Sequence, residues 1–134
     1  MHAILGAALN AFGDTVEAAQ HIARHFDLVT TELVPTVPLA ARSSLTLSFV
    51  PGRTYEVPIP VTAGETISIA TSSHDYWDSI AVLLAPDGSP VIGSDDDAGY
   101  HAAFDYTATT TGTYRLRVGF FESVITGALT VTRR

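Results

Sequence analysis

Three consecutive aspartates, Asp95, Asp96 and Asp97, form the strongest chemical signal in the sequence. Carboxylates this close repel one another unless a cation or backbone amide groups compensate their charge. Calcium suits such a turn, because Ca²⁺ takes about six to eight oxygen ligands in a flexible geometry. The three aspartates therefore predict either a calcium site or a solvated acidic turn that favours solubility.

Two further carboxylates could complete this site. The residues 86–88 (PDG) are typical of a tight turn between two β-rich runs. If these runs pair as a hairpin, the residues near Asp78 lie close to those near Asp95. We therefore expect Asp75 or Asp78 to contribute to the calcium site, although the spacing does not match an EF-hand loop.

Five aromatic side chains fall in or beside predicted loops. They could form a surface for sugars or peptides, or they could close the ends of the core, as loop-adjacent aromatics commonly do. Trp77 directly precedes a predicted strand and is the best candidate for a core position. The five are Tyr76, Trp77, Tyr100, Phe120 and Phe121.

Glu17, His21 and His25 follow one another at four-residue steps, so on a helix they share one face and could ligate zinc or copper. No Glu follows His21, which excludes the zinc-peptidase motif, and a solvated helix face is the simpler interpretation. His74 and His101 lie near the acidic turns and could add pH sensitivity.

Composition argues against several classes of function. The 14 acidic and 7 basic residues give a net charge of −7, which disfavours nucleic-acid binding. There is no cysteine, and neither a Gly-x-Ser-x-Gly elbow nor a phosphate-binding glycine loop occurs. No apolar run reaches the roughly 20 residues that span a bilayer. We therefore expect a protein that is not an enzyme and that has no nucleic-acid partner and no transmembrane segment.

The elements that carry these residues differ between the two parts of the chain. Residues 1–34 show helical periodicity, and Asp14 with Glu17 resembles a capping box that begins a helix from Thr15 to about Phe26. A shorter helix is expected before Gly13. The apolar stripe needs a cover: the β domain, another copy or a missing neighbour. It consists of Leu5, Leu9, Phe12, Val16, Ala19, Ile22, Ala23 and Phe26.

A linker with two prolines is predicted at 35–44, and residues 45–134 change to a period of two. In 113–119, for example, Tyr114, Leu116 and Val118 should face the core while Arg115 and Arg117 face outward. This pattern predicts an all-β fold, an eight-stranded antiparallel β-sandwich like a jelly roll, preceded by the helical segment. The expected strands are 45–49, 54–61, 66–71, 79–85, 89–94, 102–107, 113–119 and 125–132.

Over the last 90 or so residues, the order of these motifs resembles the bacterial pre-peptidase C-terminal domain family. The resemblance implies a small β-sandwich from the end of an exported protein, with a role in secretion, stabilisation or adhesion and with calcium in several members. The similar segments are PGRTY at 51–55, VPIPVTAGETISI at 57–69, YWDSIAVL at 76–83, APDG at 85–88, DDD at 95–97, FDY at 104–106, GTYRLRV at 112–118 and GALTV at 127–131.

The leading hypothesis is a non-catalytic, calcium-stabilised module, extracellular or at the cell surface, although the chain opens without the basic region of a secretory signal. Its partners would be an associated protein and a polysaccharide or peptide ligand. One alternative is a self-assembling structural subunit whose N-terminal helices form the contact between copies. Another is a C-terminal fragment of a secreted peptidase.

Overall fold

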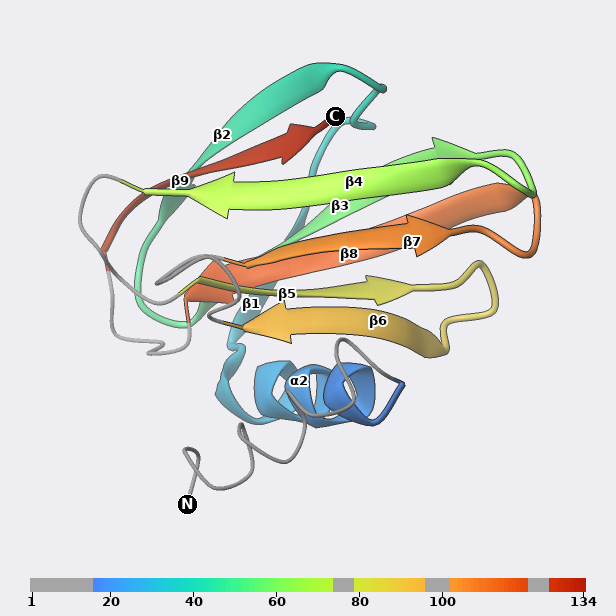
Figure 1. Cartoon of the computed structure of the whole chain (residues 1–134). Coiled ribbons are helices and arrows are strands. Elements are labelled where there is room, and N and C mark those ends of the chain that lie inside the picture. The colour runs from blue at the N-terminus through green and yellow to red at the C-terminus, as the bar shows by residue number, and fades with distance from the viewer. Residues whose placement is uncertain (1–15, 74–78, 96–101, 121–125) are drawn as a thin grey trace.

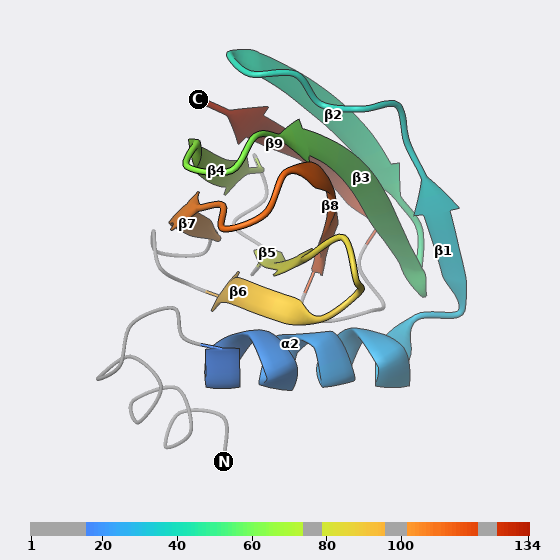
Figure 2. The same cartoon turned by 90° about the vertical axis from the view of Figure 1, so that its right-hand side faces the viewer.

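The computed structural model describes residues 16–73, 79–95, 102–120 and 126–134, which form two packed β-sheets and one helix (Figure 1). The helix α2 (Val16–Val29) lies along the outer face of one sheet, beside β6 (Figure 2). This helix is 14 residues long, and no helix in the described ranges is long and apolar enough to cross a membrane. The predicted all-β sandwich with an N-terminal helical segment is confirmed.

The two sheets contain all eight predicted strands, with bounds within two residues of those expected, and one strand more. The five-stranded sheet has the order β1-β3-β8-β5-β6, and the four-stranded sheet has the order β2-β9-β4-β7. In the first sheet the strands are β1 (Glu32–Pro35), β3 (Arg53–Val61), β8 (Gly112–Phe120), β5 (Ser79–Leu84) and β6 (Pro90–Asp95). In the second they are β2 (Ser43–Phe49), β9 (Gly127–Arg133), β4 (Thr66–Ser72) and β7 (Ala103–Thr107).

Side-chain alternation places the main core between the two sheets. On β8, Tyr114, Leu116 and Val118 are buried while Arg115 and Arg117 remain partly exposed, as the sequence predicted. Val57 and Ile59 on the neighbouring β3 are buried against the same core. Burial of such side chains is the dominant favourable contribution to a fold of this kind.

A second apolar cluster joins α2 to the outer face of β5. Its buried members are Ala19, Ile22 and Phe26 from the helix and Ile80, Val82 and Leu84 from the strand. Since β5 also faces the main core, all six of its residues are buried. The apolar face of α2 is therefore covered by the chain's own sheet. Residues 1–15, with the shorter helix expected there, lie outside the described residues.

Two glycines allow this close approach of the helix. A Cβ atom on Gly93 of β6 would stand 2.9 Å from Ile22 Cδ1 and 3.0 Å from the backbone Cα of Ala19. A Cβ atom on Gly119 of β8 would stand 3.1 Å from Phe26 Cε1. The lack of a side chain at these positions thus sets the distance between helix and sheet.

The extra strand, β1, pairs in parallel with β3 and corrects the expectation of purely antiparallel sheets. The amide groups of Thr31 and Glu32 donate to the carbonyl of Gly52, which holds the start of β1 against the β2–β3 turn. Pro35 is tolerated because β1 is an edge strand. Pro35, at which the predicted linker begins, is therefore the last residue of β1.

The rest of that segment is also fastened to the sandwich. Leu39 is buried in the main core, and its amide donates to the carbonyl of Pro58. Its carbonyl accepts a hydrogen bond of 2.9 Å from the buried guanidinium of Arg133, which also pairs with Glu65 at 3.1 Å. Leu39 thus anchors the connection between β1 and β2 to the core, while most of the other residues of this connection are exposed.

Candidate functional site

The end of the sandwich where β5 begins and β6 ends contains a buried group of hydrogen-bonded hydroxyls. The hydroxyl oxygens of Thr71 and Ser79 lie 2.7 Å apart. The amide of Ala102 donates to Thr71 Oγ1 at 2.9 Å, and its carbonyl accepts from the amide of Thr71 at the same distance. Nearby, the amide of Ala103 donates to Ser94 Oγ at 3.1 Å. These bonds fix the ends of β4, β5, β6 and β7 to one another.

The hairpin predicted between the two flanking strands is confirmed. β5 and β6 pair antiparallel, with Ile80 opposite Asp95. At the turn, Asp87 accepts hydrogen bonds from the hydroxyl of Ser89 at 2.6 Å and from its amide at 2.9 Å. These bonds, the hydroxyl bond foremost, hold the pKa of Asp87 below its ordinary value. Gly88 supplies the left-handed backbone that the turn requires, with φ of 91°.

This register brings one of the predicted calcium ligands to the end of the sandwich. Asp95 is the last residue of β6, opposite the second residue of β5. The other four candidates, Asp75, Asp78, Asp96 and Asp97, lie outside the described residues. Within the described ranges, no three His, Cys, Asp or Glu side chains lie together where they could hold a metal ion.

Phe120 corrects part of the predicted aromatic surface. It is the last residue of β8, is only 5% exposed, and packs edge-on against Phe49 with ring centroids 5.1 Å apart. It therefore belongs to the core and does not form part of an exposed binding surface. Tyr76, Trp77, Tyr100 and Phe121 lie outside the described residues.

The predicted histidine face of the helix is present on α2. Glu17 is exposed, and His21 and His25 are partly buried. The ring of His25 lies 6.4 Å from that of Phe26, between ring centroids. The three side chains do not form a metal-binding group. His74 and His101 lie outside the described part of the chain.

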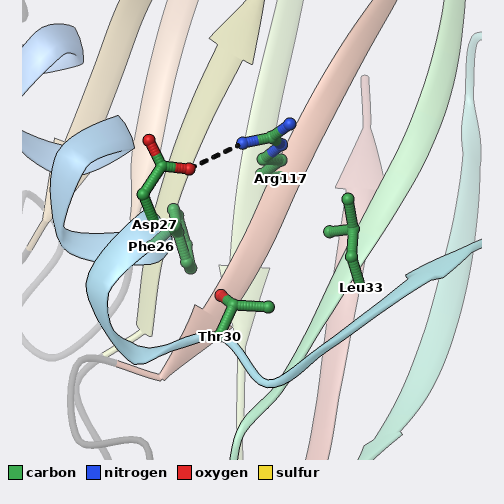
Figure 3. Close-up of a pocket in the computed structure, with 5 residues that line it drawn as sticks. All are labelled: Phe26, Asp27, Thr30, Leu33 and Arg117. Atoms are coloured by element: carbon green, nitrogen blue, oxygen red, sulfur yellow. Dashed lines mark hydrogen bonds and ion pairs between the residues drawn. The ribbon is translucent and has the colours of Figure 1, made fainter.

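A small pocket between α2, β1 and β8 was not predicted (Figure 3). It has a volume of about 190 Å³ and is lined by Phe26, Asp27, Thr30, Leu33 and Arg117. Small-molecule sites in proteins usually measure about 300–1,000 Å³. The pocket is therefore smaller than a typical ligand site.

Charged groups at this pocket form a contact between the helix and the sheet. Arg117 donates to Glu56 Oε2 at 3.1 Å and lies 3.5 Å from Asp27 Oδ1 in the last turn of α2. A carboxylate at a helix C-terminus is unfavourable because the helix dipole is negative there, and the guanidinium offsets this effect. Because Asp27 is 71% exposed, its pair contributes little to stability. The alternation in the sequence predicted that Arg117 faces outward. It did not predict the partners Glu56 and Asp27, because they lie 61 and 90 residues away in the sequence.

Comparisons with known proteins agree with this fold. No protein-family model matches the sequence, and no curated protein shows significant similarity to it. Among solved structures, the pre-peptidase C-terminal domain of a collagenase from Bacillus anthracis aligns with a TM-score of 0.62 at 15% identity, covering 76% of this chain and 94% of that domain. The resemblance predicted from the sequence is thus confirmed for the fold.

Two further structures share this architecture. PliG from Aeromonas hydrophila, a periplasmic inhibitor of g-type lysozyme, aligns with a TM-score of 0.58 at 15% identity over 77% of this chain and 98% of its own. CorA, a surface-associated copper-binding protein of Methylomicrobium album BG8, aligns with a TM-score of 0.58 at 8% identity over 75% of this chain and 98% of its own. At these identities the likeness shows the fold alone.

Proposed function

We propose that the chain is a non-catalytic, exported β-sandwich module that binds one calcium ion at the end of the sandwich where β5 begins and β6 ends. The module would stabilise or anchor an associated protein. The observation that carries this proposal is the register of the β5–β6 hairpin, in which Ile80 lies opposite Asp95. The acidic segments 75–78 and 95–97 therefore join the sandwich at adjacent strand ends.

Chain geometry supports a shared site for these two segments. Cα atoms of directly opposite residues in an antiparallel pair lie about 4.5–5.5 Å apart, and each further residue along the chain adds at most about 3.8 Å. Asp78 precedes Ser79 directly, and Asp96 follows Asp95. The proposed cation would therefore take its ligands from two segments that leave the sandwich at neighbouring strand ends.

The chemistry of the donors supports calcium over a transition metal. The candidates are Asp75, Asp78, Asp95, Asp96 and Asp97, so all of them offer carboxylate oxygens, which hard cations prefer. The hydrogen-bonded hydroxyls of Thr71 and Ser79 join the end of β4 to the start of β5, the two strand ends that flank the segment 75–78 in the sequence. A cation would then join two segments whose attachment points are already in place, so ion binding and folding would be linked.

The structural neighbours support a module of this general kind. One is a domain of a collagenase, one is a periplasmic inhibitor, and one is surface-associated. Their names motivate an extracellular, periplasmic or cell-surface location for this chain and a role other than catalysis.

The melting temperature tests this proposal. We expect calcium to raise the melting temperature relative to excess chelator at fixed ionic strength, because the ion binds only the folded state. The double variant Asp96→Asn, Asp97→Asn should lose this response, whereas Asp105→Asn, which changes an exposed carboxylate on β7, should keep it. Equal melting temperatures with calcium and with chelator would refute the calcium site.

A further inference from the structure

The outer face of the four-stranded sheet has an unusual composition over three adjacent strands. The outward positions of β2, β9 and β4 are all serine, threonine or alanine. The chain carries 14 acidic and 7 basic residues, yet none of them occupies an outward position on these three strands. The opposite sheet differs, since its outer face presents Glu56, Arg115 and Arg117 beside α2. On the fourth strand of the sheet, β7, the exposed Asp105 lies opposite Ser68 of β4. We call the uncharged surface formed by β2, β9 and β4 the hydroxyl face.

A hollow of about 350 Å³ lies on the hydroxyl face, lined by Thr46, Ser72, Ser73, Ala128 and Thr130. The strands that hold it lie side by side in Figure 1. Its volume falls within the range of about 300–1,000 Å³ that is typical of ligand sites, unlike the pocket beside Arg117. The small side chain of Ala128 leaves the space that the neighbouring hydroxyls surround.

Three hydroxyls at this hollow lie opposite one another on the neighbouring strands β2, β9 and β4. Thr130 is directly opposite Thr46 on β2 and opposite Ser72 on β4. Neighbouring strands lie about 4.7–4.9 Å apart, which is comparable to the length of one sugar unit. The hydroxyl oxygens of Thr46 and Thr130 are 3.1 Å apart and bond to each other, which fixes their orientation. Such a pair still offers one donor and several lone pairs to a ligand.

We propose that the hydroxyl face binds a neutral, linear polysaccharide, with the row of Thr46, Thr130 and Ser72 contacting its hydroxyl groups. A charged ligand would lose its hydration on this face without gaining an opposite charge, which is unfavourable. Sugar hydroxyls both donate and accept, as do the side chains of the row.

This inference rests on the anchoring role in the proposed function, since a bound polysaccharide would be what the module anchors its associated protein to, but it does not use the calcium ligands. Binding of the intact chain to cellulose, chitin and xylan should therefore be measured in calcium-containing buffer, alongside the acidic polymers pectate and alginate. We expect retention on at least one neutral polysaccharide, and we expect it to persist at high salt because no charge takes part.

Variants of exposed positions locate the site. Ala128→Gln, which fills the hollow, and Thr130→Val, which removes the central hydroxyl, should each weaken binding roughly tenfold. Thr107→Gln changes an exposed threonine of the same sheet that does not line the hollow, and it should bind like the parent chain. Melting temperatures of the three variants should match that of the parent, which excludes misfolding as the cause.

Two results would overturn the assignment: no retention on any neutral polysaccharide, or retention that Ala128→Gln leaves unchanged. Either result can occur with an intact calcium response in the melting experiment. Conversely, the chain can bind a polysaccharide while calcium leaves its melting temperature unchanged. That result would support the hydroxyl face as a polysaccharide site and refute only the calcium site.

Discussion

Thr71 and Ser79 show how single hydroxyl groups organise the end of the sandwich. Both side chains are buried, and together they accept the amide of Ala102, at 2.9 Å to Thr71 and 3.3 Å to Ser79. Within the described residues, every buried side-chain nitrogen or oxygen has a hydrogen-bond partner. Buried polar groups that are fully paired specify one arrangement of the chain, because any other arrangement leaves a group unsatisfied.

Replacing Thr71 by valine tests this contribution. The variant keeps the shape of the side chain but removes an acceptor of the Ala102 amide, so we expect the free energy of unfolding to fall by about 1–3 kcal/mol. Urea unfolding measures the change. Thr66→Val is the control, because it alters an exposed hydroxyl on the same strand and should stay within about 0.5 kcal/mol of the parent. Equal stability of Thr71→Val and Thr66→Val would contradict a structural role for the buried hydroxyl of Thr71.

Phe120 shows what residue patterns could and could not predict. Tyr114, Leu116 and Val118 alternate toward the core, and continuing their period of two by one step reaches Phe120. The sequence thus contained the signal for its burial, although the nearby loop suggested a surface position. The contact of Arg117 with Glu56 had no such signal, since it depends on the pairing of β3 with β8.

Among the elements, helix α2 covers the part of the outer face of the five-stranded sheet that β5 and β6 form. Its stripe of Ala19, Ile22 and Phe26 covers the outward side chains of β5, and Arg117 lies 3.5 Å from the exposed Asp27 in its last turn. For the three residues of this stripe, the cover is the chain's own β domain. Val16 remains 51% exposed, and Leu5, Leu9 and Phe12 lie outside the described residues, so self-association through the N-terminal helices stays a prediction.

The glycine on β6 provides a test of this docking. Gly93→Ala places a methyl group 3.0 Å from the backbone of Ala19, which cannot move without shifting the helix. We expect a loss of about 1–3 kcal/mol in the free energy of unfolding. Gly119→Ala meets only the edge of the Phe26 ring, which can shift, so it should cost less. If thermal unfolding finds Gly93→Ala as stable as the parent, α2 does not pack as closely as described.

The strands were predictable because most of them show a period of two and end at glycine or proline turns. Strand β1 was not predictable, because it has only four residues and, of these, only Val34 packs on the core. Its parallel pairing with β3 depends on the position of the β2–β3 turn, where Gly52 adopts φ of 82° beside Thr31. Such a contact between distant segments leaves no local pattern in the sequence.

For the whole molecule, the fold is confirmed and the bound calcium ion is proposed. The sandwich predicted from alternation matches the described structure, and its likeness to a pre-peptidase C-terminal domain extends over 76% of the chain. The calcium site is a proposal, inferred from the hairpin register and from the carboxylates in the sequence. Asp95 alone among its five candidate ligands belongs to a described strand.

Native mass spectrometry of the intact chain tests the calcium site most directly. In calcium-containing buffer, we expect the mass of the chain plus one Ca²⁺, and we expect the ion to disappear in the variant Asp96→Asn, Asp97→Asn. Asp105→Asn should retain it. A parent chain that carries no divalent ion under these conditions, or a double variant that still carries one, would contradict the proposed site.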